Sequence, residues 1–443
     1  MNIQLSEHFT LKKLMRFTMP SIIMMIFTSV YGVVDGFFVS NIVGKTPFAA
    51  VNFIMPFLMI LGAVGFMFGT GGSALISKTM GEGKQEKAKQ LFSLFVYTTI
   101  ICGIIIGAFG IVFIRKIASL LGASGEMLEN CVTYGRIILI ALPFYMLQYE
   151  FQSYFSAAEK PQLGLGVTIV SGVANMILDA LFMAVFKWGL VGAAAATAIS
   201  QMIGGTIPLI YFGRPNSSLL KLTRTSFDGR ALLKACTNGS SELMSNISMS
   251  VVSMLYNVQL MKYAGENGVA AYGVLMYVNM IFLAAFIGLS VGTAPIIGYN
   301  YGASNHSELK GLLKKGVLVI GVFALCMFVL AEFLAEPLAR IFVGYDRELL
   351  NLTKRGFTIF SFSFLFAGFS IFGSSFFTAL NNGLISALIS FLRTLVFQIA
   401  AVMIFPAFLG IDGIWLSIVA AEIMSVIITA IFIVKLRKKY HYL

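Results

Sequence analysis

The hydrophobic residues of this chain come in long blocks separated by short polar stretches. A helix needs about 20 apolar residues to cross about 30 Å of hydrocarbon at 1.5 Å per residue. About twelve blocks meet this length, and the spans are predicted near 17–39, 48–73, 91–114, 132–155, 163–186, 189–212, 235–262, 269–296, 312–334, 354–379, 384–408 and 413–435. Alternating ten-residue segments, which are typical of an outer-membrane barrel, are not seen. The pattern predicts an all-α polytopic membrane protein.

Composition agrees with this class of protein. The 443 residues are 58% hydrophobic and only 11% charged, too little charge to cover the surface of a soluble chain of this size. Glu7 and His8 precede the first span, which is too long for the apolar core of a signal peptide and lacks a small-residue cleavage site after it. We therefore expect this first hydrophobic block to be a membrane helix and not a cleaved leader.

The distribution of basic residues predicts the orientation. With twelve spans both termini lie on one side, and that side collects twenty of the thirty-one Lys and Arg residues, whereas the opposite loops hold nine. Cytoplasmic loops carry such an excess, so both termini are predicted to be cytoplasmic, in the inner membrane. The net charge of +12 is thereby explained by orientation and by contact with anionic lipid, and we expect no nucleic-acid partner.

A shift of 221 residues aligns the chain with itself. Among the matches are Ser29-Val30 with Ser250-Val251, Ala49-Ala50 with Ala270-Ala271, Gly71 with Gly292, Gly81 with Gly302, Ser153 with Ser374, and Gly189 with Gly410. Each half holds six spans, so the halves share one orientation and should be related by a pseudo-twofold axis along the membrane normal. The predicted organisation is a six-helix lobe at 1–212, a polar cytoplasmic linker at 213–231 and a second six-helix lobe at 232–443. Two such lobes that rock about a central cavity are typical of a secondary transporter.

A carboxylate inside a span costs at least about 2.5–3.5 kcal/mol on insertion scales, so each one is a candidate functional residue. The candidates are Asp35, Glu150, Asp179, Glu242 and Glu422, with Arg136 and Arg393 as possible counter-charges.

Asp35 and Asp179 lie at matching depths, about 27 Å and 24 Å along outward-running spans. Asn175 is one turn before Asp179 on the same face, and Thr197 is about 12 Å below the outer end of the next span. These four oxygen-bearing side chains are predicted to gather in the outer half of the first lobe. Hard oxygen ligands suit Na⁺, and a close carboxylate pair can instead hold a proton. The alternative interpretation is an acidic pair that only bridges helices through hydrogen bonds.

The twin positions of these four residues are Tyr256, Val396, Ala400 and Ile418. Because the second lobe lacks the carboxylates, the predicted ion site is one-sided.

The remaining charged residues have other predicted roles. Glu150 and Glu242 lie in the cytoplasmic halves of their spans, where they would attract a cationic substrate if they face the cavity, or would be hydrogen-bonded helix residues if they do not. Glu422 is expected to pack within its bundle, and Arg393 to neutralise a neighbouring carboxylate or backbone carbonyls.

Cofactor and metal chemistry find no support in the sequence. The four cysteines are scattered without a C-x-x-C pair, and all three histidines lie in tails or loops. Proton chemistry within the bilayer would therefore fall to carboxylates, and no cofactor is expected beyond H⁺ or Na⁺ as coupling ion.

The sequence resembles the multidrug and toxic compound extrusion (MATE) family over essentially its whole length. The resemblance is carried by VVDGFFVSNIVG (33–44), GEGKQEKAKQ (81–90), GLVGAAAATAISQ (189–201), the Asn175–Asp179 pair and GENGVAAYGV…GYNYGASN (265–305), the last resembling the bacterial drug-efflux branch. It implies twelve helices in two lobes and export in exchange for Na⁺ or H⁺. The family's first-helix aspartate falls on Asp35, and its N-lobe cation site on Asn175, Asp179 and Thr197. An acidic residue that another branch carries in the tenth helix has no equivalent within 354–379.

The function predicted from sequence is thus an antiporter that exports small organic, often cationic, compounds. Two alternatives stay open. A flippase for a lipid-linked precursor would be expected to line its cavity with several basic residues, and only Arg136 and Arg393 are within spans. An intramembrane acyl or glycosyl transferase would need a catalytic constellation, and none is visible. We expect a protein that is not an enzyme, that binds a small-molecule substrate and membrane lipid, and that is monomeric.

Overall fold

The computed structural model describes residues 3–344 and 346–442, and within them every regular element is a helix. In chain order these are α1 Leu11–Phe38, η1 Val39–Val43, α2 Lys45–Gly81, α3 Gln85–Leu120, α4 Gly125–Ile140, α5 Leu142–Ala157, α6 Pro161–Asp179, η2 Ala180–Val185, α7 Gly189–Gly213, α8 Gly229–Gly302, α9 His306–Val343, α10 Arg347–Ser361, α11 Phe364–Ala379, α12 Gly383–Phe391, η3 Leu392–Val396, α13 Phe397–Leu409 and α14 Ile411–Tyr440. The elements η1, η2 and η3 are short π-helical turns within longer spans.

The helices account for the predicted spans. Nine helices in the described part of the chain are long and apolar enough to cross a membrane, and two bent pairs, α4–α5 and α10–α11, bring the number to eleven. The 74-residue α8 is broken at Gly265, where φ is +62°, a backbone conformation that suits glycine. Each half of α8 is long enough for one span, so the observed helices correspond to the twelve predicted blocks in order.

Two spans predicted as continuous are bent. Between α4 and α5 the chain turns by 58°, and Pro143, which lacks the N–H of a helical hydrogen bond, lies at the start of α5. Between α10 and α11 it turns by 49° without a proline, through a tight turn in which the Ser363 N–H donates to the Phe360 carbonyl oxygen at 2.9 Å. The first bend has a sequence signal, and the second has none of this kind.

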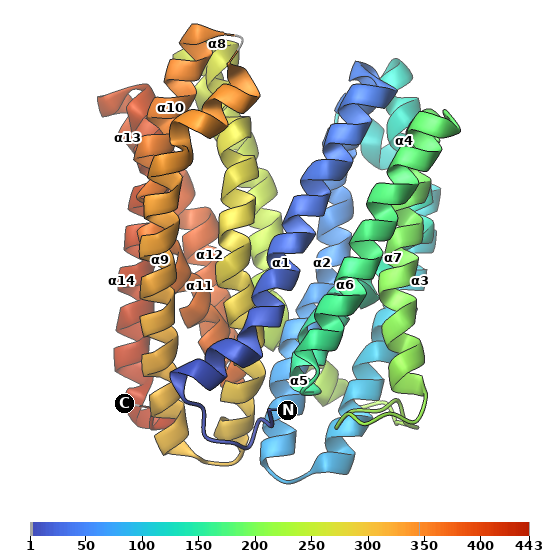
Figure 1. Cartoon of the computed structure of the whole chain (residues 1–443), viewed down its shortest axis with the longest axis vertical. Coiled ribbons are helices and arrows are strands. Elements are labelled where there is room, and N and C mark those ends of the chain that lie inside the picture. Colours follow the sequence, from blue (N-terminus) through green and yellow to red (C-terminus); the bar gives the residue numbers. More distant parts are fainter. Residues whose placement is uncertain (1–2, 345, 443) are drawn as a thin grey trace.

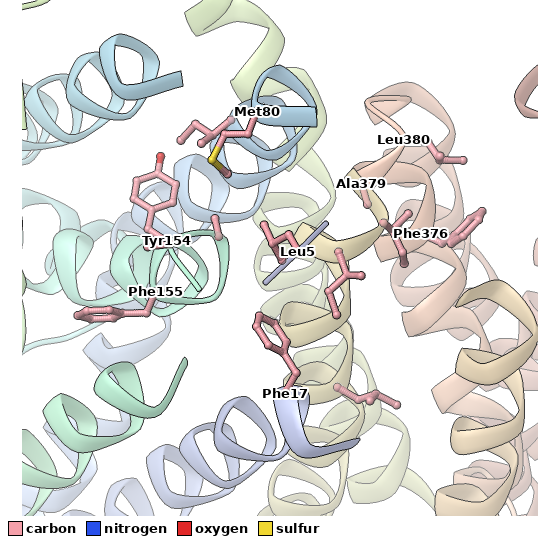
Figure 2. Close-up of a cluster of buried hydrophobic side chains, with 14 of the residues drawn as sticks. Leu5, Phe17, Met80, Tyr154, Phe155, Phe376, Ala379 and Leu380 are labelled. Atoms are coloured by element: carbon pink, nitrogen blue, oxygen red, sulfur yellow. The ribbon is translucent and has the colours of Figure 1, made fainter. Parts of the chain in front are cut away.

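The helices form two lobes, α1–α7 and α8–α14, seen on the right and left of Figure 1. Both termini, the α2–α3 and α8–α9 turns and the connection between the lobes lie at one end, called here the terminal end (Figure 1). There α1 and α2 pack against α8, and one apolar cluster joins both lobes, including Met80 and Tyr154 with Phe376 and Leu380 (Figure 2). Towards the other end, called here the open end, the ribbons of the two lobes diverge (Figure 1).

The lobe contact at the terminal end follows the repeat. A Cβ on Gly81 would lie 2.0 Å from the Tyr299 carbonyl oxygen, and a Cβ on Gly302 would lie 2.0 Å from the Lys78 carbonyl oxygen. Gly81 with Gly302, and Lys78 with Tyr299, are both separated by 221 residues. The two glycines therefore let α2 and α8 meet backbone to backbone in a symmetric contact, which agrees with the predicted pseudo-twofold relation of the lobes.

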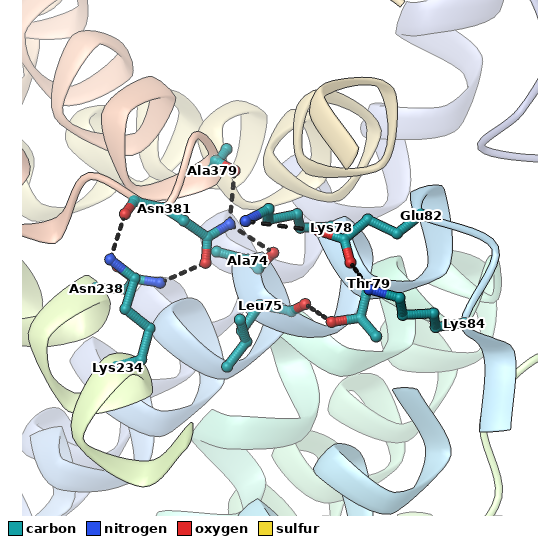
Figure 3. A network of polar contacts seen from close by, with 10 residues as sticks. All are labelled: Ala74, Leu75, Lys78, Thr79, Glu82, Lys84, Lys234, Asn238, Ala379 and Asn381. Atoms are coloured by element: carbon teal, nitrogen blue, oxygen red, sulfur yellow. Dashed lines mark hydrogen bonds and ion pairs between the residues drawn. The ribbon is translucent and has the colours of Figure 1, made fainter. Parts of the chain in front are cut away.

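A polar network also joins the lobes at the terminal end (Figure 3). The Asn381 side chain, in the α11–α12 turn, donates to the Ala74 carbonyl oxygen of α2 at 3.1 Å and accepts from Asn238 of α8 at 2.7 Å. Lys234 donates to the Asn381 carbonyl oxygen at 2.7 Å. Nearby, a hydrogen bond from Lys84 holds the pKa of the Glu82 carboxyl below its usual value.

Candidate ion-coupling site

The structure brings together Asp35 and Asp179, residues 144 positions apart in the sequence. Asp35 lies near the open end of α1, and Asp179 is the last residue of α6. Their carboxyl groups are close enough to interact electrostatically. Thr197 of α7 reaches the pair as well, because its Oγ1 lies 3.5 Å from Asp35 Oδ1.

The acidic pair has no basic partner among the described residues. Asp179 is fully buried, and neither of its carboxylate oxygens has a hydrogen-bond partner among the described residues. The side-chain nitrogen of Asn175, one turn earlier on α6, is also buried without a partner. Two buried carboxylates repel each other unless a proton or a cation lies between them. The arrangement can therefore take up a monovalent cation, with oxygen atoms from α1, α6 and α7 around it.

π-Helical turns adjoin both acids. η2 begins directly after Asp179, and η1 begins four residues after Asp35. A π-helical turn interrupts the regular i to i−4 hydrogen bonding and is frequent at functional sites. Both turns lie in the segments that carry the helices beyond the acids to the open end.

Sequence reasoning missed a polar chain next to this site. Gln148 of α5 donates to the Ser171 hydroxyl of α6 at 3.3 Å, and that hydroxyl donates to the Ser200 carbonyl oxygen of α7 at 2.7 Å. Ser200 in turn donates to the Thr197 carbonyl oxygen at 2.8 Å. The i, i+4, i+8 spacing of Ser171, Asn175 and Asp179 was the available signal, since it puts the three on one helix face.

Tyr134 is a second residue near the site that sequence reasoning missed. It is buried on α4, donates to the Met55 sulfur at 3.8 Å, and its hydroxyl also interacts with Thr197. Tyr134 therefore lies next to Thr197, on the side of the site that faces α4.

Glu150 lies among the helices of the first lobe. It is fully buried inside the first lobe, where the backbone of Gly69 approaches its Cα and where Thr99 and Tyr154 are its neighbours. Neither carboxylate oxygen has a conventional partner within the described residues. The expectation that Glu150 faces a cavity is not supported, because α2, α3 and α5 enclose it.

The second lobe contains an internally neutralised charge pair. Arg393, in η3, donates from Nε and Nη2 to the Glu422 carboxylate of α14 at 2.9–3.1 Å, and both side chains are largely buried. This agrees with the predicted packing of Glu422 and with neutralisation of a carboxylate by Arg393. Glu242 of α8 is half-buried and close enough to Arg393 to interact electrostatically.

Arg136 does not serve as a counter-charge to the acidic pair. Its side chain on α4 is exposed, and the acid that it influences is Glu129 on the same helix. Within the described residues no group of three or more His, Cys, Asp or Glu side chains is placed to hold a metal ion.

Comparisons with known proteins place this architecture in a family. The MatE family model matches residues 20–181 and 243–404, once in each lobe. The chain belongs to the MatE family, the multidrug and toxic compound extrusion transporters.

Relatives and solved structures extend the likeness over the whole chain. A multidrug export protein, MepA, of Staphylococcus haemolyticus is 26% identical over 97% of this chain and 94% of its own length, and MepA of Staphylococcus aureus (strain MRSA252) is 24% identical over the same shares. A multidrug resistance MATE transporter solved in an outward-facing conformation superimposes with a TM-score of 0.92, at 22% identity and 98% coverage of both chains. A Vibrio cholerae MATE transporter, VcmN, gives a TM-score of 0.88 at 23% identity, with the same coverage. These structures support the fold, twelve helices in two lobes, and membership of the family makes the protein a multi-pass membrane transporter.

Proposed function

We propose that this protein is a secondary antiporter that exports small organic, often cationic, compounds in exchange for H⁺ or Na⁺. The observation that carries the proposal is the Asp35–Asp179 pair, in which a half-buried and a fully buried carboxyl group interact with no basic side chain beside them among the described residues. Acidic residues within a membrane span cost free energy. Binding and release of a cation in each transport cycle would explain why this pair is present. Asn175 and Thr197 complete the proposed coupling site.

We further propose that the terminal end is cytoplasmic and that the protein resides in the cytoplasmic membrane. The support is the excess of basic residues in the loops of that end. With this orientation the lobes meet on the cytoplasmic side and diverge on the outer side. An ion that enters from outside would therefore reach the acidic pair before it reached the cytoplasmic side. The proposed division into lobes at 1–212 and 232–443, joined by a cytoplasmic linker at 213–231, is consistent with residues 214–228 being non-helical.

The driving force follows from charge balance. Exporting one monovalent cation against 100 mV, inside negative, costs about 2.3 kcal/mol, and one entering H⁺ or Na⁺ returns the same amount. A one-for-one exchange is therefore voltage-neutral and is driven by the concentration gradient of the ion. If two ions entered, one for each carboxylate, the membrane potential would add to the driving force for export.

The substrate class rests on two supports. Relatives at 24–26% identity are multidrug export proteins, and Glu242 remains a partly accessible acid in the second lobe that can attract a cation. We expect a monomer in contact with membrane lipid. The names of these relatives favour drug export over the flippase and transferase alternatives.

The test is transport by purified protein in liposomes. Efflux of a fluorescent organic cation should require an imposed inward gradient of H⁺ or Na⁺, and substrate should release the ion in return. A panel of toxic compounds in an efflux-deficient bacterial host identifies which substrates to use. Transport of the organic cation at a rate that does not depend on either the H⁺ or the Na⁺ gradient would contradict the proposal.

A further inference from the structure

The segment that precedes α1, residues 3–10 and here called the leading segment, is folded into the terminal end of the molecule. Leu5 and Phe9 are fully buried, whereas Gln4, Ser6 and His8 are exposed. A turn shapes the segment, because the Glu7 N–H donates to the Gln4 carbonyl oxygen and the Gln4 N–H donates to the Glu7 carboxylate. Glu7 is also paired with Lys13 in the first turn of α1. The segment is therefore a built structure that presents two apolar side chains inwards.

The apolar side chains enter the cluster that joins the lobes. Leu5 and Phe9 belong to the same buried cluster as Tyr154 and Phe155 of the first lobe and Phe376 and Leu380 of the second. Figure 2 shows Leu5 between these two groups. Phe9 adds an edge-to-face contact with Phe17 of α1, with ring centroids 6.0 Å apart. The segment thus fills space between the lobes on the side where they meet.

Polar contacts tie the leading segment to both lobes. On the first lobe, the Leu5 N–H donates to Glu159, in the turn between α5 and α6, at 2.6 Å. On the second lobe, Glu308 in the first turn of α9 accepts from the Phe9 N–H at 3.0 Å and lies 2.6 Å from His8 Nδ1. The Lys315 ammonium donates to the Phe9 carbonyl oxygen. A carboxylate that is 6% exposed and receives two contacts from one short peptide is a specific attachment point.

We propose that the leading segment is a latch that holds the lobes together at the terminal end and that must leave Glu308 and Lys315 before this end can open. The reason is geometric. The segment continues directly into α1 of the first lobe, so any separation of α1 from α9 pulls Phe9 away from its partners on α9. Opening the terminal end therefore requires loss of the Glu308 contacts and exposure of Phe9, and both oppose it.

The latch is tested by measuring distance rather than transport, so its outcome is independent of the proposed exchange reaction. Spin labels at Lys84→Cys and Ser307→Cys report the terminal end, and labels at Leu120→Cys and Phe408→Cys report the open end. All four positions are exposed, and the four native cysteines are first replaced by alanine. Distance distributions are recorded by pulsed electron resonance in lipid nanodiscs.

Phe9→Ala should raise the ratio of terminal-end-open to closed molecules about tenfold or more, since it removes a fully buried aromatic ring from the closed state only. The label pair at the open end should shorten in the same sample. Leu11→Ala truncates an apolar side chain that is 42% exposed, so it is the matched control and should leave both distributions unchanged.

Glu308→Gln leaves the packing of Leu5 and Phe9 unchanged and weakens only the attachment of the leading segment to α9. It should therefore raise the ratio of terminal-end-open to closed molecules by a smaller factor than Phe9→Ala. Its control is Glu86→Gln, at an exposed acid in the first turn of α3. Monodisperse elution and an unchanged helical spectrum identify folded variants, and Glu308→Gln carries the test if Phe9→Ala does not fold. Terminal-end distances in Glu308→Gln and Phe9→Ala that match those of their controls would overturn the latch.

Discussion

The two lobes share a helical framework but treat buried charge in opposite ways. In the first lobe, Asp35 and Asp179 lie together, and no cationic side chain of the described residues is paired with them. In the second, Glu422 is held by Arg393 through three hydrogen bonds. In the proposed transport cycle a bound proton or cation balances the acids of the first lobe, whereas the second lobe supplies its own counter-charge. Two lobes with the same arrangement of helices can thus differ in how they balance buried charge, because a few side chains decide that balance.

The largest expected effect is at the unpaired acids. Asp35→Asn removes the charge that attracts the coupling ion, and efflux by reconstituted protein should fall to the level of protein-free liposomes. Asp179→Asn should do the same or change the ion dependence. Folding should be retained, because an amide is less costly to bury than an unpaired carboxylate.

The measurement is efflux of a fluorescent cation under a maintained ion gradient, with substrate binding to purified protein measured separately. Retained substrate binding with lost efflux would locate the defect in coupling. Efflux at the wild-type rate by Asp35→Asn would remove the coupling role from Asp35, and Glu150 and Glu242 would become the next acids to test.

The neutralised pair of the second lobe should matter for stability. Glu422→Gln leaves the Arg393 guanidinium buried without its carboxylate, and loss of one partner of a buried pair costs about 3–5 kcal/mol in the free energy of unfolding. Denaturation in detergent, followed by the helical signal, measures this loss. Replacing both residues, as Arg393→Gln with Glu422→Gln, should recover most of it. A double variant as unstable as the single one would show that the pair does more than balance charge.

The symmetric contact made by Gly81 and Gly302 tests a feature that the two lobes share, so equivalent substitutions in the two lobes should have equal effects. Gly81→Ala and Gly302→Ala each put a methyl group 2.0 Å from a backbone oxygen of the other lobe, so α2 and α8 must move apart. Each should cost about 1–3 kcal/mol, in the range of overpacked contacts. Gly166→Ala on α6, where a Cβ meets nothing within 4 Å, is the control. Thermal midpoints of the three variants give the result, and a large effect from only one of the interface glycines would contradict the symmetric contact.

The smallest expected effect is at the neutral ligand. Thr197→Ala removes a hydroxyl 3.5 Å from Asp35, and one neutral hydrogen bond contributes about 0.5–1.5 kcal/mol. The ion concentration for half-maximal efflux should therefore rise about two- to tenfold, with the maximal rate nearly unchanged. Serine at this position restores the hydroxyl and should restore the affinity. An equal loss in both variants would assign Thr197 a packing role against Tyr134 instead.

Much of the architecture was determined by the sequence itself. The lengths of the apolar blocks gave the helices in order, because a bilayer imposes a minimum length on any segment that crosses it. The 221-residue repeat gave the two lobes, and the bend near Pro143 had its own signal in a residue that cannot complete the helical hydrogen bonding. The proximity of Asp35, Asp179 and Thr197 was also predictable, because depth along a span can be counted in residues.

The tertiary structure decided what depth cannot specify, which is the direction in which a side chain points around its helix. Glu150 and Glu242 had similar depths, yet α2 and α3 enclose Glu150 while Glu242 lies near Arg393. The pairing of Arg393 with Glu422 and the chain from Gln148 to Thr197 depend on how neighbouring helices are rotated against each other. The docking of Leu5 and Phe9 between the lobes depends on packing of residues hundreds of positions apart, such as Phe9 with Glu308. Periodicity and composition describe one segment at a time, whereas these contacts exist only once several segments have packed together.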